Sequence, residues 1–306
     1  MVLEIYEFIT EVHFPDRIIV DSNASDTEDM YEQNFISEDL RQFIMENLSG
    51  VINSFKPFKS SGPDGIFPAL LQNGTIEIKM HMIKLYVSSL SMGFIPKVWR
   101  KGKIVFIPKT GSRPNDLAKS YRPITLSSFM LKTLEKLLDK YIRQNYLSRN
   151  LLHPRQFAYQ EGKSTSMAVK ALVTDIERLL SYRNSAIGLS LDIEGAFDNV
   201  RYDVLKRALE IKEVSLTIIN WIYSMLKTRT LECEIAGDIL QFKPSKGCPQ
   251  GGAHSPLLWT LVIDELLYKL NNHYLRTDGF ADDLFILISG FDLSTMSELI
   301  QKHVIW

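Results

Sequence analysis

Residues 279–287 read GFADDLFIL, so two aspartates, Asp282 and Asp283, stand together between two apolar runs. The apolar runs predict two strands of a hairpin with the aspartates at its tip. An aspartate pair in a tight turn is usually only turn chemistry, because Asp tolerates bridge and left-handed backbone conformations. Here, buried strands would push two carboxylates together at one edge of a sheet. Adjacent carboxylates in such a place repel each other, and a divalent cation is the usual compensation.

A second apolar strand ends on an acidic residue. Residues 187–193, IGLSLDI, alternate at a period of two, and Asp192 lies at the end of this run. Asp192 could supply a third carboxylate beside the doublet. Three carboxylates can hold two Mg²⁺ ions about 3.5–4 Å apart, as an in-line phosphoryl displacement requires. Mg²⁺ is the expected ion, with Mn²⁺ as an alternative, because it takes few protein ligands and completes its shell with phosphates and water.

The composition is that of an ordinary globular chain. Of 306 residues, 45% are hydrophobic and 23% are charged, which suggests one large domain or two packed subdomains. Three glutamates among the first 11 residues argue against a secretory signal peptide. No apolar run approaches the roughly 18 residues of a membrane span. The two cysteines, which have no CxxC spacing, argue against a disulfide scaffold or a zinc site. We expect an intracellular protein that does not enter a membrane.

The net charge of −1 hides a strong asymmetry along the chain. Residues 1–50 sum to about −10, residues 51–170 to about +14 and residues 171–306 to about −5. Eight lysines and arginines lie within residues 97–122. A phosphate backbone or a nucleotide triphosphate is the natural partner of such a block. A solvated basic face is the other interpretation of the same pattern.

Helical and strand patterns alternate along the chain without repeats. Apolar spacing and capping residues predict helices over residues 76–92, 129–146, 164–180 and 255–270. Strand patterns predict strands over residues 103–108 and 187–193, a hairpin around residues 236–238 and a strand pair near residues 277–289. The acidic, polar residues 15–33 are expected to form a poorly ordered arm. These elements predict an α+β fold with helices backing a small, mostly antiparallel sheet.

The ordered motifs resemble those of reverse transcriptases. LDIEGAFDN (residues 191–199), followed about 90 residues later by FADD, resembles motifs A and C, and KGCPQGGAHSPLLWTLVIDEL (residues 246–266) resembles motif B. Three upstream blocks resemble the fingers motifs: SFKPFKSSGPDGIFPALLQ (54–72), FIPKTGSRPNDLAKSYRPITLSSFMLKTLEKLLD (106–139) and HPRQFAYQEGKSTSMAVKALV (153–173). The set is most similar to LINE-type, non-long-terminal-repeat retrotransposons, especially the Jockey-like branch, and covers about residues 50–290.

The resemblance implies a right-hand polymerase fold with fingers and palm only. The implied divisions are an acidic N-terminal arm and first helix (1–48), fingers (49–185) and palm (186–306), with a fingers-associated insertion around 203–245. About 16 residues follow the FADD hairpin, so we expect the palm to be truncated after motif C and the thumb to be absent. The missing thumb and endonuclease segments would be supplied elsewhere, if at all.

The catalytic assignments carry over residue by residue. The resemblance implies that Asp192, Asp282 and Asp283 are metal-binding carboxylates and that the backbone carbonyl of Ile193 is a further metal ligand. Phe197 matches the aromatic steric gate, whose ring occupies the space that a 2′-hydroxyl would need. The gate implies selection of deoxynucleotides.

Further assignments surround the nucleotide and the template. Gln250 and Gly251 match the loop under the incoming nucleotide and the template base, where glycine permits close backbone approach. Arg122 and Lys109 match the fingers cations that hold the triphosphate, Arg122 as a fork and Lys109 as a point charge. His254 stands where related elements usually have an apolar residue, so the packing of motif B is in question. The candidates for template binding are Ser61, Gly62, Pro63, Asp64 and Lys163.

Three functions are compatible with these motifs. The favoured one is an RNA-directed DNA polymerase of a retrotransposon, acting on an RNA template, a DNA primer and dNTPs through a two-Mg²⁺ reaction. The family implies a location in the cytoplasm and the nucleus. The second is a catalytically inactive RNA-binding remnant of a retroelement. The third is a metal-dependent nuclease using the same aspartates, in which the Phe197 gate and the Pro-Gln-Gly loop would have no purpose.

Overall fold

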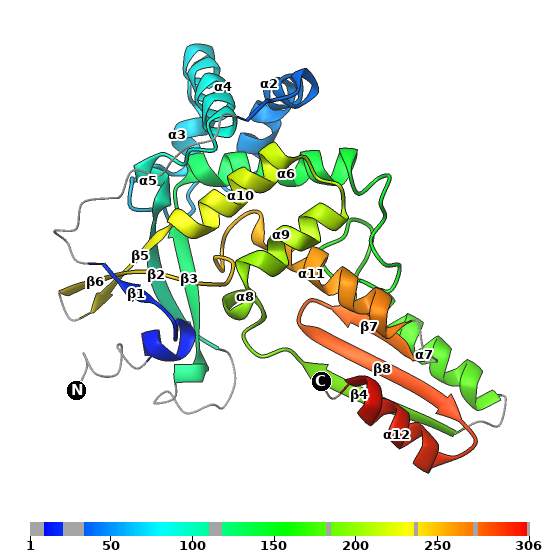
Figure 1. Ribbon diagram of the computed structural model, residues 1–306. Helices are drawn as coiled ribbons and strands as arrows, with labels where there is room; N and C mark the ends of the chain where they lie inside the picture. Colours follow the sequence, from blue (N-terminus) through cyan, green and yellow to red (C-terminus); the bar gives the residue numbers. More distant parts are fainter. Residues whose placement is uncertain are drawn as a thin grey trace. The chain divides into compact units, whose positions relative to one another are not determined.

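The computed structural model of the chain describes residues 9–20, 34–109, 118–181, 185–235, 238–271 and 275–304 (Figure 1). The chain forms two compact units. Unit 1 comprises residues 1–149 and 197–255, and unit 2 comprises residues 150–196 and 256–306. Both units are therefore built from segments that are not contiguous in sequence. The proposed fingers and palm ranges do not coincide with these units and stay a prediction.

Unit 1 is built on a five-stranded sheet. In spatial order its strands are β1 (Ile18–Ile19), β6 (Asp238–Lys243), β5 (Thr230–Ile235), β2 (Lys101–Pro108) and β3 (Tyr121–Ser127). β2 and β5 pair in parallel, and the other neighbours pair antiparallel. Buried side chains from three of these strands, among them Ile104, Leu231 and Phe242, form an apolar cluster against which Phe14 packs.

Helices accompany this sheet. They are α2 (Glu38–Asn53), α3 (Pro68–Gln72), α4 (Ile76–Ser91), α5 (Lys97–Arg100), α6 (Phe129–Asn145), α8 (Ala196–Asn199), α9 (Tyr202–Ile211) and α10 (Leu216–Thr228). α6 begins after Ser128, whose hydroxyl accepts a hydrogen bond from the Met130 amide at 3.1 Å. Its predicted apolar stripe is buried, with Leu134 and Leu138 fully inaccessible to solvent. Capping and amphipathic spacing therefore determine this helix as the sequence predicts.

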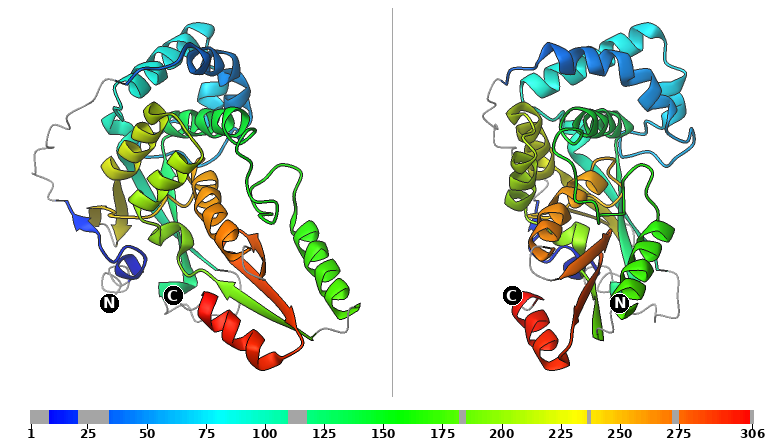
Figure 2. Two further views of the ribbon diagram at one scale, coloured as in Figure 1. Left: turned by 45° about the vertical axis from the view of Figure 1, so that its right-hand side comes forward. Right: turned by 90° about the vertical axis from the view of Figure 1, so that its right-hand side faces the viewer.

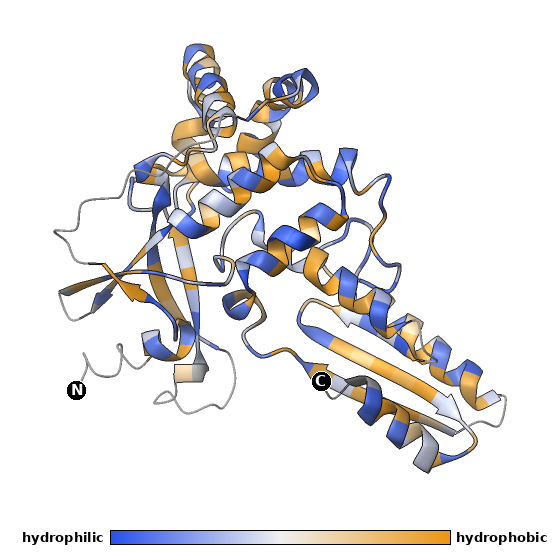
Figure 3. Cartoon of the chain, in the orientation of Figure 1, coloured by the Kyte–Doolittle hydropathy of each residue, from blue (hydrophilic) through white to orange (hydrophobic). Residues whose placement is uncertain are grey.

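Unit 2 contains a three-stranded antiparallel sheet in the order β4 (Ser185–Asp192), β8 (Asp283–Gly290) and β7 (Arg276–Phe280). Its helices are α7 (Thr165–Ser181), α11 (Ser255–Leu270) and α12 (Leu293–Val304). Apolar residues of β4 and β8 form a core with residues of α11 and α12. Figure 2 shows α7 and α12 on opposite sides of this sheet. Figure 3 shows that β8 is hydrophobic along most of its length but hydrophilic where it begins.

The two sheets with their helices agree with the predicted α+β class. The expectation of a poorly ordered arm is wrong for Ile18 and Ile19, because their backbones pair with Lys243 and Phe242 on β6. The backbone amide of Val20 extends this pairing by donating to Gln241 O at 3.2 Å. Residues 21–33 of the arm lie outside the described residues. The expected absence of a thumb stays a prediction.

Two further properties bear on the class of protein. Within the described ranges, no helix combines the length and the hydrophobicity that a membrane crossing needs. Cys233 and Cys248 are free and buried. Burial raises the pKa of Cys233 to about 11 and that of Cys248 to about 12. Both thiols are therefore protonated at neutral pH, and neither is a ready nucleophile.

Candidate nucleotidyl-transfer site

The candidate catalytic aspartates meet at one end of the unit 2 sheet. β4 ends at Asp192, β8 begins at Asp283, and these two residues are direct partners in the antiparallel register. Residues in such positions have Cβ atoms about 4.5–5.5 Å apart. The backbone amide of Ile193 donates to the carbonyl of Asp282 at 3.1 Å, which holds the turn against the end of β4. Asp192 and Asp283, which are 91 positions apart in the sequence, are therefore neighbours here.

Strand alternation decides which way the opposed carboxylates point. Leu191 and its partner Leu284 belong to the apolar face of β4 and β8. Asp192 and Asp283 are one position out of phase with these leucines, so they lie on the opposite face. Both aspartates are exposed. The same period of two that buries the strand thus presents a pair of carboxylates to solvent.

Helix α11 anchors the turn that carries the doublet. Ala281 has a positive φ of 57°, which a non-glycine residue rarely adopts. Such a conformation costs about 1–3 kcal/mol and persists only where the surroundings enforce it. The indole Nε1 of Trp259 on α11 donates to the Ala281 carbonyl at 2.8 Å. The segment that resembles motif B therefore helps to fix the position of motif C.

The aspartates repel one another. Burial, followed by the charges of Asp282 and Asp192, raises the pKa of Asp283 above its ordinary value. Within the described part of the chain, no three His, Cys, Asp or Glu side chains are gathered into a group that could hold a metal ion. A preformed three-ligand site is therefore not seen. The opposed, exposed pair still fits Mg²⁺, which is commonly held by one or two carboxylates and completed by substrate phosphates.

In unit 1, the loop of residues 246–254 (the motif B loop) is hydrogen-bonded to the segment that follows motif A. The amide of Cys248 donates to Phe197 O at 2.6 Å, and the amide of Gly247 donates to Val200 O at 2.7 Å. Gly247 has a φ of +83°, and a Cβ there would lie 2.4 Å from the Asp198 carbonyl oxygen. Only glycine allows this approach of two backbones.

Gln250 is held at both ends. Its carbonyl accepts from the Thr125 amide of β3 at 2.7 Å, and its Nε2 donates to Asp198 Oδ2 at 2.8 Å. Gly251, with a φ of +104°, approaches the same strand, and a Cβ there would lie 2.9 Å from Thr125 O. The close approach expected at Gly251 is thus made to this chain's own backbone.

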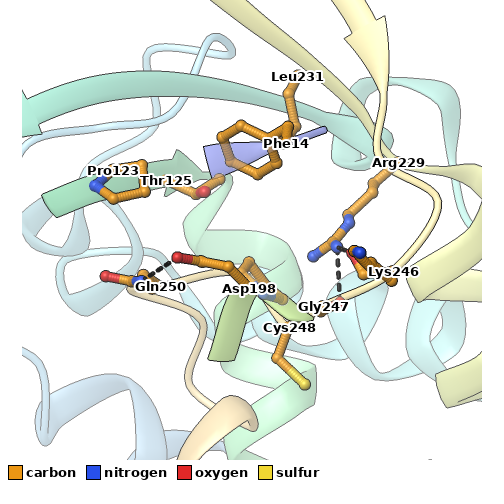
Figure 4. A pocket seen from close by; sticks show the side chains of 11 residues that line it. Phe14, Pro123, Thr125, Asp198, Arg229, Leu231, Lys246, Gly247, Cys248 and Gln250 are labelled. Atoms are coloured by element: carbon orange, nitrogen blue, oxygen red, sulfur yellow. Dashed lines mark hydrogen bonds between the residues drawn. The ribbon is translucent and has the colours of Figure 1, made fainter. Parts of the chain in front are cut away.

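Arg229, which sequence reasoning missed, anchors the beginning of the loop. It is 6% exposed, and its Nη2 donates to the carbonyls of Gly247 at 2.7 Å and Lys246 at 3.0 Å. Arg229, Asp198 and the loop line a small pocket, with Phe14 at its side (Figure 4). The only sequence signal was one arginine between an apolar helix and an apolar strand.

His254, whose effect on packing was in question, is accommodated by α6. Its side chain is 1% exposed, and its Nδ1 donates to Glu135 O at 3.0 Å. The carboxylate of Glu135, also buried, accepts from the Ala253 amide at 2.8 Å. Glu135 of α6 therefore binds the end of the motif B loop through both its backbone carbonyl and its side-chain carboxylate.

The candidate cations lie in different units. Arg122, an exposed residue of β3, and Lys109 belong to unit 1, whereas the aspartates and Lys163 belong to unit 2. Lys163 Nζ donates to the carbonyls of Pro154 and Gln156, both at 2.7 Å. Burial lowers the pKa of Lys163 below its ordinary value. Lys163 thus ties its own loop together, and its contact with the template stays a prediction.

Two of the template candidates shape the SGPDG loop (residues 61–65). A Cβ on the buried Gly62 would lie 2.6 Å from backbone atoms of Ser127 and Ser128, where β3 passes into α6. Asp64 Oδ1 accepts from the Ile66 amide at 3.2 Å, as in an Asx turn. The roles of this loop, Ser61 and Pro63 included, in template binding stay predictions.

The antiparallel sheet with aspartates at its end and the order of the motifs are the features expected of a template-dependent nucleotidyltransferase. The sequence model described as "Reverse transcriptase (RNA-dependent DNA polymerase)" matches residues 107–304. The chain belongs to this family, whose members have the right-hand polymerase fold.

Relatives place the chain near mobile-element polymerases. It is 31% identical over 255 residues to the "Retrovirus-related Pol polyprotein from type-1 retrotransposable element R1" of Bradysia coprophila, with 83% of this chain and 25% of that protein covered. It is 24% identical over 301 residues to the "RNA-directed DNA polymerase from mobile element jockey" of Drosophila melanogaster, with 93% and 32% covered. These matches confirm the LINE-type resemblance.

The chain spans about a quarter to a third of the length of these relatives. Among solved structures, apo telomerase from Candida tropicalis, truncated from its C-terminal domain, aligns with a TM-score of 0.46 and 17% identity. The alignment covers 80% of this chain and 56% of that chain.

Proposed function

We propose that this chain catalyses RNA-templated DNA synthesis for a LINE-type element, joining the 3′-hydroxyl of a DNA primer to the α-phosphorus of a deoxynucleotide. The observation that carries the proposal is the opposition of Asp192 and Asp283 at the end of β4 and β8, with Asp282 in the adjoining turn. Reverse transcriptases bind a template, a primer and dNTPs and use divalent metal ions. The proposal assigns these partners to this chain.

The proposed metal ligands are Asp192, Asp282, Asp283 and the backbone carbonyl of Ile193, holding two Mg²⁺ ions or Mn²⁺ in their place. Divalent cations at such a site neutralise charge that develops on the reacting phosphate and activate the attacking hydroxyl. The two opposed carboxylates are exposed, which leaves room for phosphate oxygens and water to complete the coordination. The chain itself provides the spacing and the orientation of the carboxylates.

The remaining residues of the proposal act on the nucleotide. Phe197 would exclude a 2′-hydroxyl, and Gln250 and Gly251 would line the space under the incoming nucleotide. Arg122 and Lys109 would bind the triphosphate. The hydrogen bond from the Cys248 amide to Phe197 O at 2.6 Å supports this grouping, because it ties the gate residue to the motif B loop.

The direct test is extension of a labelled DNA primer annealed to an RNA template, with Mg²⁺ and all four dNTPs. We expect products whose length follows the template and which disappear when EDTA removes the metal. RNA binding without extension across a range of salt and protein concentrations would support the inactive remnant. Cleavage of the RNA without extension would support the nuclease.

Replacing Phe197 with Val should raise the ratio of ribonucleotide to deoxynucleotide incorporation by at least about tenfold, because the smaller side chain no longer fills the 2′-hydroxyl space. Competition between labelled rNTP and dNTP in the extension assay measures this ratio. Phe291→Val is the matched control, since Phe291 is 89% exposed. An unchanged ratio in Phe197→Val would place the gate at another residue.

Adding Mg²⁺ should raise the thermal midpoint by a few degrees at millimolar concentration, because a ligand bound only to the folded state stabilises it. Since the pKa of Asp283 is raised in the folded state, stability without metal should fall as the pH rises from about 4 through that pKa. Scans with Mg²⁺ and with EDTA measure the shift. The rise of the thermal midpoint with Mg²⁺ should be largely lost in Asp283→Asn. It should be kept in Asp292→Asn, because the Asp292 side chain caps α12. Equal shifts in both variants would remove Asp283 from the metal site.

A further inference from the structure

Asp198 follows the gate residue directly, yet the activity proposed above gives it no role. It lies in α8 and is 9% exposed. Its Oδ2 accepts a hydrogen bond from Gln250 Nε2 at 2.8 Å, drawn in Figure 4. His13 Nδ1 lies 3.8 Å from the same oxygen. A buried carboxylate beside the gate thus contacts the side chain of the glutamine in the motif B loop.

The acceptor chemistry of Asp198 determines how the Gln250 amide is turned. An ionised carboxylate can only accept hydrogen bonds, whereas an amide has a donor end and an acceptor end. The NH₂ end of Gln250 must therefore face Asp198, and its Oε1 points away, as Figure 4 shows. Because the Gln250 carbonyl is also fixed by the Thr125 amide at 2.7 Å, neither the backbone nor the side chain can turn without losing a bond.

Residues near the N-terminus contribute to the surroundings of Asp198. His13 and Phe14 lie beside Asp198, and Phe14 lines the pocket that Asp198 and Gln250 share. Asp16 pairs with Lys246, the first residue of the motif B loop, at 2.8 Å. A hydrogen bond removed from solvent is electrostatically stronger than one in water. Asp198, at 9% exposed, keeps its end of the bond largely out of solvent, and it shares the pocket with Phe14.

We propose that Asp198 is a positioning residue for selection of the incoming deoxynucleotide. By fixing the amide of Gln250, it presents Oε1 as a hydrogen-bond acceptor to a donor group of the nucleotide or of the template base it pairs with. Asp198 also links the Gln250 side chain to Phe197, which directly precedes Asp198 in the chain. The inference rests on the proposed function and adds the residue that orients one of its nucleotide contacts.

Steady-state kinetics separate positioning from general support of the fold. Asp198→Ala should raise the KM for dNTP roughly tenfold or more, as expected for a lost hydrogen bond to a charged group, with a smaller change in kcat. Asp198→Asn should restore most of the affinity, because its Oδ1 accepts the same bond. Asp203→Ala is the matched control, since the Asp203 side chain is 61% exposed and pairs only with Arg201 among the bonds described.

A double-mutant cycle tests whether Asp198 acts through Gln250. Asp198→Ala combined with Gln250→Ala should have nearly the same KM as Gln250→Ala alone, because the bond is already lost in the single variant. Effects that multiply would overturn the proposal, since they would mean that the two residues act separately. Failure of Asp198→Asn to recover affinity would overturn it as well.

A second readout does not depend on catalysis. In protein labelled with ¹⁵N-glutamine, the side-chain amide signal of Gln250 is identified by its loss in Gln250→Ala. That signal should move in Asp198→Ala and stay in place in Asp203→Ala. If the wild-type chain extends no primer, the proposed function fails while this signal still decides whether Asp198 holds Gln250. An unmoved signal in Asp198→Ala would overturn the inference even in an active polymerase.

Discussion

Replacing Asp192 with Asn should slow metal-dependent nucleotide addition roughly a thousandfold, the scale of losing one preorganised electrostatic group from an active site. Asp192 ends β4 directly opposite Asp283, and asparagine keeps its size while removing its charge. The pair that would share a cation then has one carboxylate fewer. Single-turnover primer extension with saturating template measures the rate of the chemical step.

The same variant should remain folded. Asp192 is exposed at a strand end, so its replacement leaves no buried polar group without a hydrogen-bond partner. Its charge also helps to raise the pKa of Asp283, so its removal should leave the metal-free thermal midpoint unchanged or higher. Asp292→Asn serves as the control for both rate and midpoint. A rate within tenfold of the wild type would show that Asp192 is not a metal ligand.

Gly247→Ala should destabilise unit 1 by roughly 3 kcal/mol, through an unfavourable backbone conformation and a clash that cannot relax. The added Cβ would lie 2.4 Å from the carbonyl oxygen of Asp198 and 2.7 Å from its carbonyl carbon. Both are backbone atoms, so the loop or α8 must move. We expect nucleotide affinity to fall together with stability, because the motif B loop carries Gln250. Urea unfolding and hydrogen exchange of residues 245–252 measure the loss of stability, and the KM for dNTP measures the loss of affinity.

Gly65→Ala separates strain from clash. Gly65 also has a positive φ, +70°, but no heavy atom lies within 4 Å of its would-be Cβ. Its replacement should cost only the left-handed backbone penalty, about 1–2 kcal/mol. Similar losses for the two variants would mean that the contact between Gly247 and Asp198 adds nothing, and that the loop can shift without cost.

Short-range patterns predicted the elements well. Helix α4 was expected at residues 76–92 and spans Ile76–Ser91, and helix α11 spans the predicted residues 255–270. The hairpins β5–β6 and β7–β8 lie where turn residues interrupt apolar runs. These features depend on capping groups, apolar spacing and turn residues that are close in sequence. The structure therefore has little freedom to alter them.

The pairing of distant elements could not be predicted in the same way. No pattern near Ile18 indicates that it pairs with Lys243, and none indicates that β2 pairs with β5 in parallel. α7 forms where apolar spacing predicts a helix, but its only buried residue is Asp175, which pairs with Arg155 and Arg276. Such contacts close long loops, and their existence depends on which surfaces meet after the elements have formed.

For the candidate site, too, some features were predictable from the sequence and others were not. The sequence by itself determined the family and the order of the motifs and singled out the candidate aspartates, because chemical type and spacing are local properties. Only the tertiary structure placed Asp192 opposite Asp283, set the register that puts both on the exposed face, and brought Asp198, Arg229 and Glu135 to the motif B loop. A one-residue slip of β4 against β8 would leave every local pattern intact yet turn Asp192 toward the core. Register is decided by packing across the whole sheet, which no single segment encodes.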